Sequence, residues 1–116
     1  MTTIDEQVKE KLAALRAVYF AELPNKVADI AVCFERWERT QDAKLLHDFY
    51  RMAHSLAGSG ALYEAVDLGH KAKELELLVK SAATNRTALT AHEIAQGRAF
   101  LAELASMATA LKEQRV

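Results

Sequence analysis

Apolar residues recur at the helical period along almost the whole chain, and this pattern limits the fold more than any other feature. Side chains three or four residues apart share one face of a helix, so each apolar stripe predicts an amphipathic helix with one buried side. The first part of the chain carries two such stripes. They consist of Ile4, Val8, Leu12, Leu15 and Tyr19, and of Phe20, Leu23, Val27, Ile30, Phe34 and Trp37. Only one proline and four glycines occur, which favours an all-helical fold.

Pro24 lies close to the point where the first two stripes meet. Proline lacks an amide hydrogen and crowds the preceding turn, so it either begins a new helix or kinks a continuous one. Of these two arrangements we favour a helix that begins near Leu23. A shorter first helix is then expected to pack across one end of the molecule.

Residues 40–42 (Thr-Gln-Asp) interrupt the apolar pattern and offer amino-terminal caps for the next helix. The residues that this helix is expected to bury are Leu46, Phe49, Ala53, Leu56, Gly60 and Tyr63. Its other face carries His47, Tyr50, Arg51, His54 and Gly58. The two faces separate a predicted core side from a predicted contact side.

Two further apolar stripes follow, at residues 61–79 and 94–111, and each predicts a helix. The polar residues 81–90 between them are expected to form the longest loop. Thr90 and Glu93 have the spacing of a capping box, which places the start of the last helix there.

Length and composition are those of a single helical domain. A chain of 116 residues corresponds to one domain, and 51% hydrophobic residues are enough for a core at this size. Four long amphipathic segments with short connections pack most simply as an up-down-up-down four-helix bundle. We therefore expect an all-α domain spanning residues 1–116, with a short additional amino-terminal helix.

Charge and cysteine content argue against several functional classes. With 15 basic and 16 acidic residues the net charge is −1, unlike the basic surface of a nucleic-acid-binding protein. The single cysteine, Cys33, cannot form an internal disulfide and fits a reducing compartment. No apolar run approaches the roughly 20 residues that span a membrane, and no histidine pair has the four-residue spacing of a metal site. We expect a cytoplasmic monomer that binds neither nucleic acid, membrane nor metal.

His54 is the strongest candidate functional residue. Gly58 follows it by four residues, and residues four apart lie on one helical face. Glycine inside a helix costs about 0.5–1 kcal/mol relative to alanine, so a glycine at this position indicates close approach by another group. Gly58 leaves bare backbone beside the imidazole, which predicts that His54 is presented to a partner protein. Gly60 is expected instead to allow close packing between helices.

The segment 54–61 (HSLAGSGA) resembles the signature of histidine-containing phosphotransfer (HPt) domains. In that signature a leucine and a glycine follow the histidine by two and four residues, as they do here. Residues 72–76 (AKELE) are similar to the family's Ala-x-x-Leu-Glu on the next helix. Residues 20–24 (FAELP) are similar to the stretch that often opens the family's bundle. The resemblance extends over residues 12–111.

The resemblance implies that His54 relays a phosphoryl group in a multistep phosphorelay. The donor and acceptor would be a histidine kinase, or its receiver domain, and the aspartate of a response regulator. No nucleotide-binding loop or acid–base pair is visible in the sequence, so we expect a phosphocarrier without turnover of its own. No cofactor is expected on this chain, and Mg²⁺ is expected in the partner receiver domain. Partner contacts are expected at His47, Tyr50, Arg51 and Gly58.

Two positions depart from the family pattern. Ala57 stands where many members carry a lysine that neutralises the phosphoryl group, so Arg51, Lys71 and Lys73 are the candidate replacements. Glu64 stands where the family usually has glycine, which suggests a different turn or a longer helix. The alternative function is a non-phosphorylated helical adaptor that binds a receiver or kinase domain.

Overall fold

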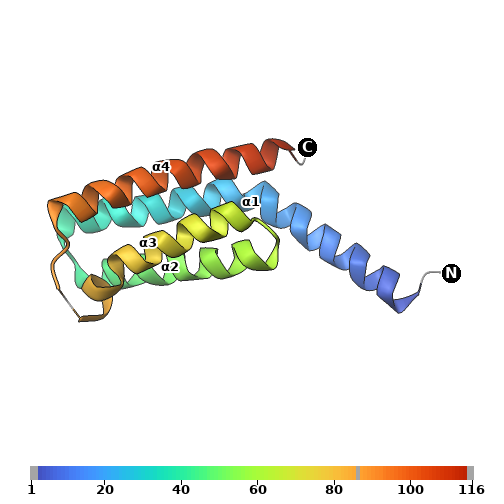
Figure 1. The fold of residues 1–116 in the computed structure, drawn as a ribbon, viewed down its shortest axis with the longest axis horizontal. Coiled ribbons are helices and arrows are strands. Elements are labelled where there is room, and N and C mark those ends of the chain that lie inside the picture. The colour runs from blue at the N-terminus through green and yellow to red at the C-terminus, as the bar shows by residue number, and fades with distance from the viewer. Residues whose placement is uncertain (1–2, 86, 115–116) are drawn as a thin grey trace.

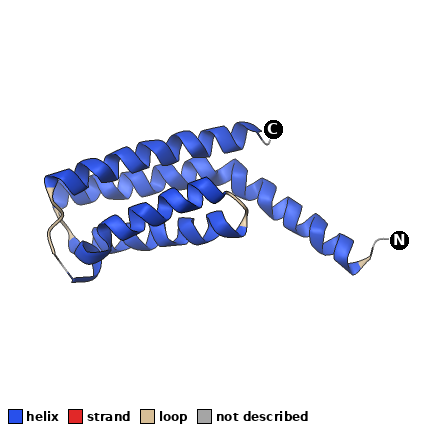
Figure 2. Ribbon diagram, viewed as in Figure 1, coloured by secondary structure: helices blue, strands red, loops and turns tan. Residues whose placement is uncertain are grey.

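The computed structural model describes residues 3–85 and 87–114, which form four α-helices (Figures 1 and 2). These helices are α1 (Ile4–Thr40), α2 (Ala43–Leu62), α3 (Val66–Asn85) and α4 (Ala91–Gln114). Each helix packs against its neighbours in the chain, and α1 also packs against α4, which closes an up-down-up-down bundle. The predicted all-α four-helix bundle is therefore confirmed. None of the helices in the described residues is both long enough and apolar enough to cross a lipid bilayer.

α1 is one continuous helix with Pro24 inside it, so the expected break near Leu23 and the separate first helix are wrong. A proline inside a helix costs about 3 kcal/mol. Phe20, Leu23 and Val27 are completely or almost completely buried on both sides of the proline, and their packing holds the backbone helical. The other arrangement, a kink in one long helix, agrees with Figure 1, where the first part of α1 leaves the bundle at an angle.

Residues 4–18 of α1, here called the arm, extend beyond the bundle (Figure 1). The expectation that this segment packs across one end is wrong, because its large apolar side chains are about half exposed or more. The molecule measures 58 × 26 × 20 Å, and its radius of gyration is 16.1 Å. A compact domain of this length would have a radius of gyration of about 13 Å, so the arm accounts for the elongation.

The bundle core forms where the predicted stripes meet. Phe34 packs against Trp37 and Phe49, with ring centroids 5.4 and 4.8 Å apart. The predicted core side of α2 is confirmed, since its residues are buried except for the half-buried Tyr63. Cys33 is also buried, as expected for a packing residue. The apolar period alone thus identified most of the core.

The predicted helix caps are present. Asp42 accepts a hydrogen bond from the Lys44 amide at 2.9 Å, and Thr90 and Glu93 form both hydrogen bonds of a capping box. The predicted long loop is shorter than expected, because α3 continues to Asn85. Buried Ala82 extends the core face of α3 by one turn and keeps this segment helical.

The turn between α2 and α3 contains Glu64, the second departure from the family pattern. α2 ends at Leu62, and Glu64, in the turn that follows, has a φ of 63°. Glycine adopts this left-handed conformation most easily. The Glu64 carboxylate forms an ion pair with Arg16, and the Tyr63 ring stacks on Tyr19 with centroids 4.5 Å apart. These contacts attach the turn to α1 where the arm leaves the bundle.

α2 and α3 approach closely through two glycines. A Cβ atom on Gly60 would lie 2.8 Å from the Gly69 Cα and 3.2 Å from the Ala65 carbonyl oxygen. A Cβ atom on Gly58 would meet nothing within 4 Å. The interpretation of Gly60 as a packing glycine is confirmed, and Gly58 has open space above it.

We predict that substitution by alanine has opposite effects on stability at Gly60 and at Gly58. Gly60→Ala should lower the free energy of unfolding by about 1–3 kcal/mol, because the new methyl group overlaps backbone atoms that cannot move aside. The matched control, Gly58→Ala, should raise it by up to about 1 kcal/mol through better helix propensity. Urea denaturation of both variants measures the difference. Equal stability of the two variants would contradict the close approach of α2 and α3.

Candidate functional site

His54 lies on α2 at the edge of a cleft of about 440 Å³ between α2 and α3. The cleft is lined by His54, Ala57, Gly58 and Ala61 from α2, and by Val66, Gly69, His70, Lys73 and Glu76 from α3. The His54 side chain is 67% exposed. The histidine chosen from the sequence is therefore accessible, and the open space above Gly58 belongs to the same cleft.

Glu76 orients the His54 ring. Its carboxylate oxygen Oε1 lies 2.6 Å from His54 Nδ1, and its side chain is only 4% exposed. An ionised carboxylate has no proton to donate, so the hydrogen of this bond belongs to Nδ1. In the neutral ring, the lone pair is then on Nε2, on the side away from Glu76. The pair leaves one nucleophilic nitrogen on a ring that is mostly exposed.

Lys73 supplies positive charge beside this pair. Its ammonium nitrogen lies 3.1 Å from Glu76 Oε2, one turn earlier on α3. Burial of the Glu76 carboxyl raises its pKa, but the hydrogen bond from His54 and the contact with Lys73 more than compensate. The net result is a pKa below the ordinary value for glutamate. Glu76 is therefore held ionised although it is buried.

The three candidate cations occupy three different places. Lys73 lines the cleft with His54. Lys71 instead pairs with Glu74 at 2.9 Å and with Glu103 on α4 at 2.8 Å, so the structure does not bring it into the cleft. Arg51 lines a groove on the other side of α2. Among the three candidates, Lys73 is the cation that shares the cleft with His54.

The remaining predicted contact residues lie along the outer surface of α2. His47 is exposed, Tyr50 is half-buried, and their ring centroids are 6.4 Å apart. Both precede His54 by one or two turns, and Gly58 follows it by one. The predicted face is thus one continuous strip of helix surface centred on His54.

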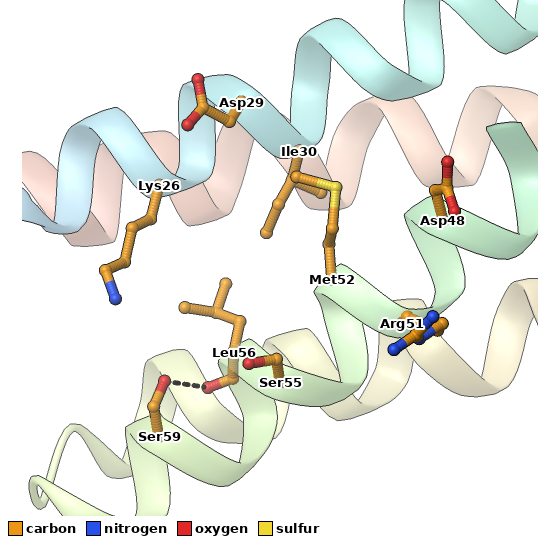
Figure 3. Close-up of a pocket in the computed structure, with 9 residues that line it drawn as sticks. All are labelled: Lys26, Asp29, Ile30, Asp48, Arg51, Met52, Ser55, Leu56 and Ser59. Carbon is orange, nitrogen blue, oxygen red and sulfur yellow. Dashed lines mark hydrogen bonds between the residues drawn. The ribbon is translucent and has the colours of Figure 1, made fainter.

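The groove between α1 and α2 borders this strip on its other side (Figure 3). It has a volume of about 590 Å³ and contains Ile30, Met52 and Leu56 among its lining residues. Lys26 and Asp29 from α1 and Asp48 and Arg51 from α2 also line it, together with Ser55 and Ser59. Both signs of charge therefore surround the apolar residues of the groove.

Glu76 is a site residue that the sequence reasoning missed. Glu76 follows Ala72 by four residues and precedes Val79 by three, which places a carboxylate on the buried side of a helix. Acidic residues are almost never fully buried unless they are paired, so a glutamate at this position predicts an oppositely charged or hydrogen-bonding side chain beside it. His70 is exposed, and the packing of α3 on α2 places it at the lining of the cleft.

The chemistry of the site follows from the exposed imidazole. Within residues 3–85 and 87–114, no three His, Cys, Asp or Glu side chains are arranged to hold a metal ion. An imidazole whose Nδ1 donates a hydrogen bond to a carboxylate is a nucleophile that can take up an electrophilic group at Nε2. The buried carboxylate stabilises the positive charge that the ring acquires. The arrangement can therefore carry a group on Nε2 of the ring.

Comparison with known proteins identifies one family. The family model described as the Hpt domain matches residues 14–114. No curated protein and no solved structure matches the chain significantly. The matched range includes α2 and α3, which form the His54 cleft, and excludes most of the arm.

We predict that Glu76 makes stability depend on pH in the acid range. Because its pKa is lowered by folding, ionised Glu76 stabilises the folded state above its ordinary pKa of 4.5. This contribution is lost as the pH falls through the lower folded value. Glu76→Gln cannot titrate, so its free energy of unfolding should fall less steeply than that of the wild type below pH 4.5.

Denaturation curves at a series of acid pH values measure this slope. The matched control is Glu22→Gln, which makes the same change at an exposed glutamate of α1 and should keep the wild-type slope. Parallel curves for the wild type and Glu76→Gln would show that the His54–Glu76 pair is not formed in solution.

Proposed function

We propose, since this chain belongs to the family of Hpt domains, that His54 is the residue on which it carries a phosphoryl group in a multistep phosphorelay. Membership of the family makes the chain a histidine phosphotransfer module of two-component signalling. The observation that supports His54 is its exposed ring, held through Nδ1 by buried Glu76.

The proposed reaction begins with the lone pair on His54 Nε2. It attacks the phosphorus of an aspartyl phosphate on a receiver domain, or of a phosphohistidine on a kinase. The N–P bond forms as the bond to the donor breaks, and the donor atom leaves with the bonding electron pair. Nδ1 keeps its proton, so the ring becomes positively charged and is stabilised by the Glu76 carboxylate. Transfer to the next aspartate is the same reaction in reverse.

Lys73 is our candidate for the cation that neutralises the phosphoryl group. It lines the cleft with His54, and its ammonium group already lies beside Glu76. Ala57, where many family members carry lysine, faces the same cleft and leaves room for this longer side chain. A cation on α3 would then perform the role that the family usually assigns to α2.

The partners that we propose are the receiver domain of a response regulator and a histidine kinase. A partner would dock on the exposed strip of α2, with contacts to His47, Tyr50, Arg51 and Gly58. Open space above Gly58 admits a loop of the partner close to the imidazole. Mg²⁺ would be held by the receiver domain. A carrier has to release each partner, so we expect a small interface of about 1,200 Å².

The first test is the substitution His54→Gln. It should abolish phosphoryl acceptance, because a carboxamide is not a nucleophile at phosphorus. Glutamine can still donate a hydrogen bond to Glu76, so the free energy of unfolding should change by less than about 1 kcal/mol. The measurement is transfer of radiolabelled phosphate from a panel of phosphorylated receiver domains.

His70→Gln is the matched control, because it removes the other imidazole of the same cleft. It should accept phosphate as the wild type does. Labelling of His54→Gln would refute the assignment of the acceptor. A wild-type chain that binds receivers without being labelled would favour the non-phosphorylated adaptor.

A second pair of variants tests the source of positive charge. Lys73→Ala should slow phosphoryl transfer by up to about fivefold, since an exposed cation contributes at most about 1 kcal/mol. Lys71→Ala should leave the transfer rate unchanged, because its partners are Glu74 and Glu103 outside the cleft. Rapid-quench kinetics with one receiver domain measure both rates. Equal rates for the two variants would exclude a special role for Lys73.

A further inference from the structure

The arm presents to solvent the kind of surface that the rest of α1 buries. Ile4 is 79% exposed, and Val8, Leu12 and Leu15 are each about half exposed. Successive residues of a helix are rotated by about 100°, so these side chains lie on the same face of α1 as Tyr19, which is buried in the bundle. The core-facing stripe of α1 therefore continues past the end of the bundle with no helix packed on it among the described residues.

The exposed stripe is large for a protein of this size. Together with Val18, which is 56% exposed, its residues offer an apolar patch of about 500 Å², near the upper end of what monomers expose. Two such patches pressed together, with the side chains that flank them, would bury roughly 1,000–1,200 Å² in total. That area reaches the lower limit for a specific interface.

The charges of the arm complement a second arm that runs in the opposite direction. Asp5 lies near its amino end and Arg16 near its carboxyl end, and both flank the stripe on the same side, whereas Lys9, Glu10 and Lys11 lie between them. An antiparallel pair sets the acidic end of each arm beside the basic part of the other, and a parallel pair sets like charges together. Arg16 already pairs with Glu64, but a guanidinium group has five N–H donors and can bind two carboxylates.

We propose that the arm pairs with the arm of a second copy of this chain, antiparallel and stripe against stripe. The two-fold axis then passes near Leu12, and Ile4 of one copy lies beside Val18 of the other. Such an isologous contact closes on itself and gives a dimer. The dimer replaces the monomer expected from the sequence alone.

The phosphotransfer site remains open in this dimer. The arm leaves the bundle at the end formed by the α2–α3 turn and points away from it (Figure 1). Antiparallel pairing therefore places the two bundles at opposite ends of the paired arms. Each copy keeps its own His54 cleft accessible, so the proposal does not depend on the function of that site.

Sedimentation equilibrium of the full chain, from about 1 µM to about 1 mM, tests the proposal. An interface of this size should give a dissociation constant in the micromolar range. Leu12→Glu puts a carboxylate in the middle of the stripe and should weaken association at least about tenfold. Ala13→Glu adds the same charge one residue along, 100° around the helix, and should leave association unchanged.

Two further measurements exclude trivial explanations. Circular dichroism should show the same helix content in both variants at concentrations where each is a monomer, because both positions are exposed. Phosphoryl acceptance by His54 should be the same in both variants, so a failure of the arm and a failure of the phosphotransfer site are told apart. A wild-type chain that stays monomeric, or a dimer that Leu12→Glu does not weaken, would overturn the proposal.

Discussion

The contact between the backbones of α2 and α3 is the constraint on which the candidate site depends. Gly60 and Gly69 bring the two helices closer than side chains would allow. At that separation a glutamate on α3 can reach a histidine on α2, and the Glu76 carboxylate lies 2.6 Å from His54. A wider separation would leave the buried Glu76 carboxylate without its hydrogen bond from His54. An unpaired buried carboxylate would lower the free energy of unfolding of a small bundle.

Charge in the cleft is balanced over three side chains from two helices. Glu76 is ionised because His54 and Lys73 oppose the effect of burial. The same carboxylate that orients the ring would stabilise the positive charge of a phosphorylated imidazole. In the proposed reaction, Glu76 would position the ring and compensate its positive charge, and Lys73 would neutralise the phosphoryl group.

The two halves of α1 show how tertiary packing overrides local preference. Pro24 favours a helix start, yet buried side chains before and after it keep the helix continuous. Beyond the bundle no such packing acts on the arm, and its apolar stripe is exposed. The same periodic pattern is thus buried in one part of α1 and exposed in the other, because burial depends on whether another helix packs against it.

The sequence by itself determined the helical class, the core stripes, the capping residues at Asp42 and Thr90, and the choice of His54. These depend on periodicity and short-range chemistry, which act within one or two turns of the chain. Only the tertiary structure decided that Glu76 pairs with His54, that Lys73 lies in the cleft while Lys71 does not, and that the apolar stripe of the arm is exposed. Those facts depend on how α3 is rotated against α2 and on where the bundle ends, and both are set by contacts between residues far apart in the sequence.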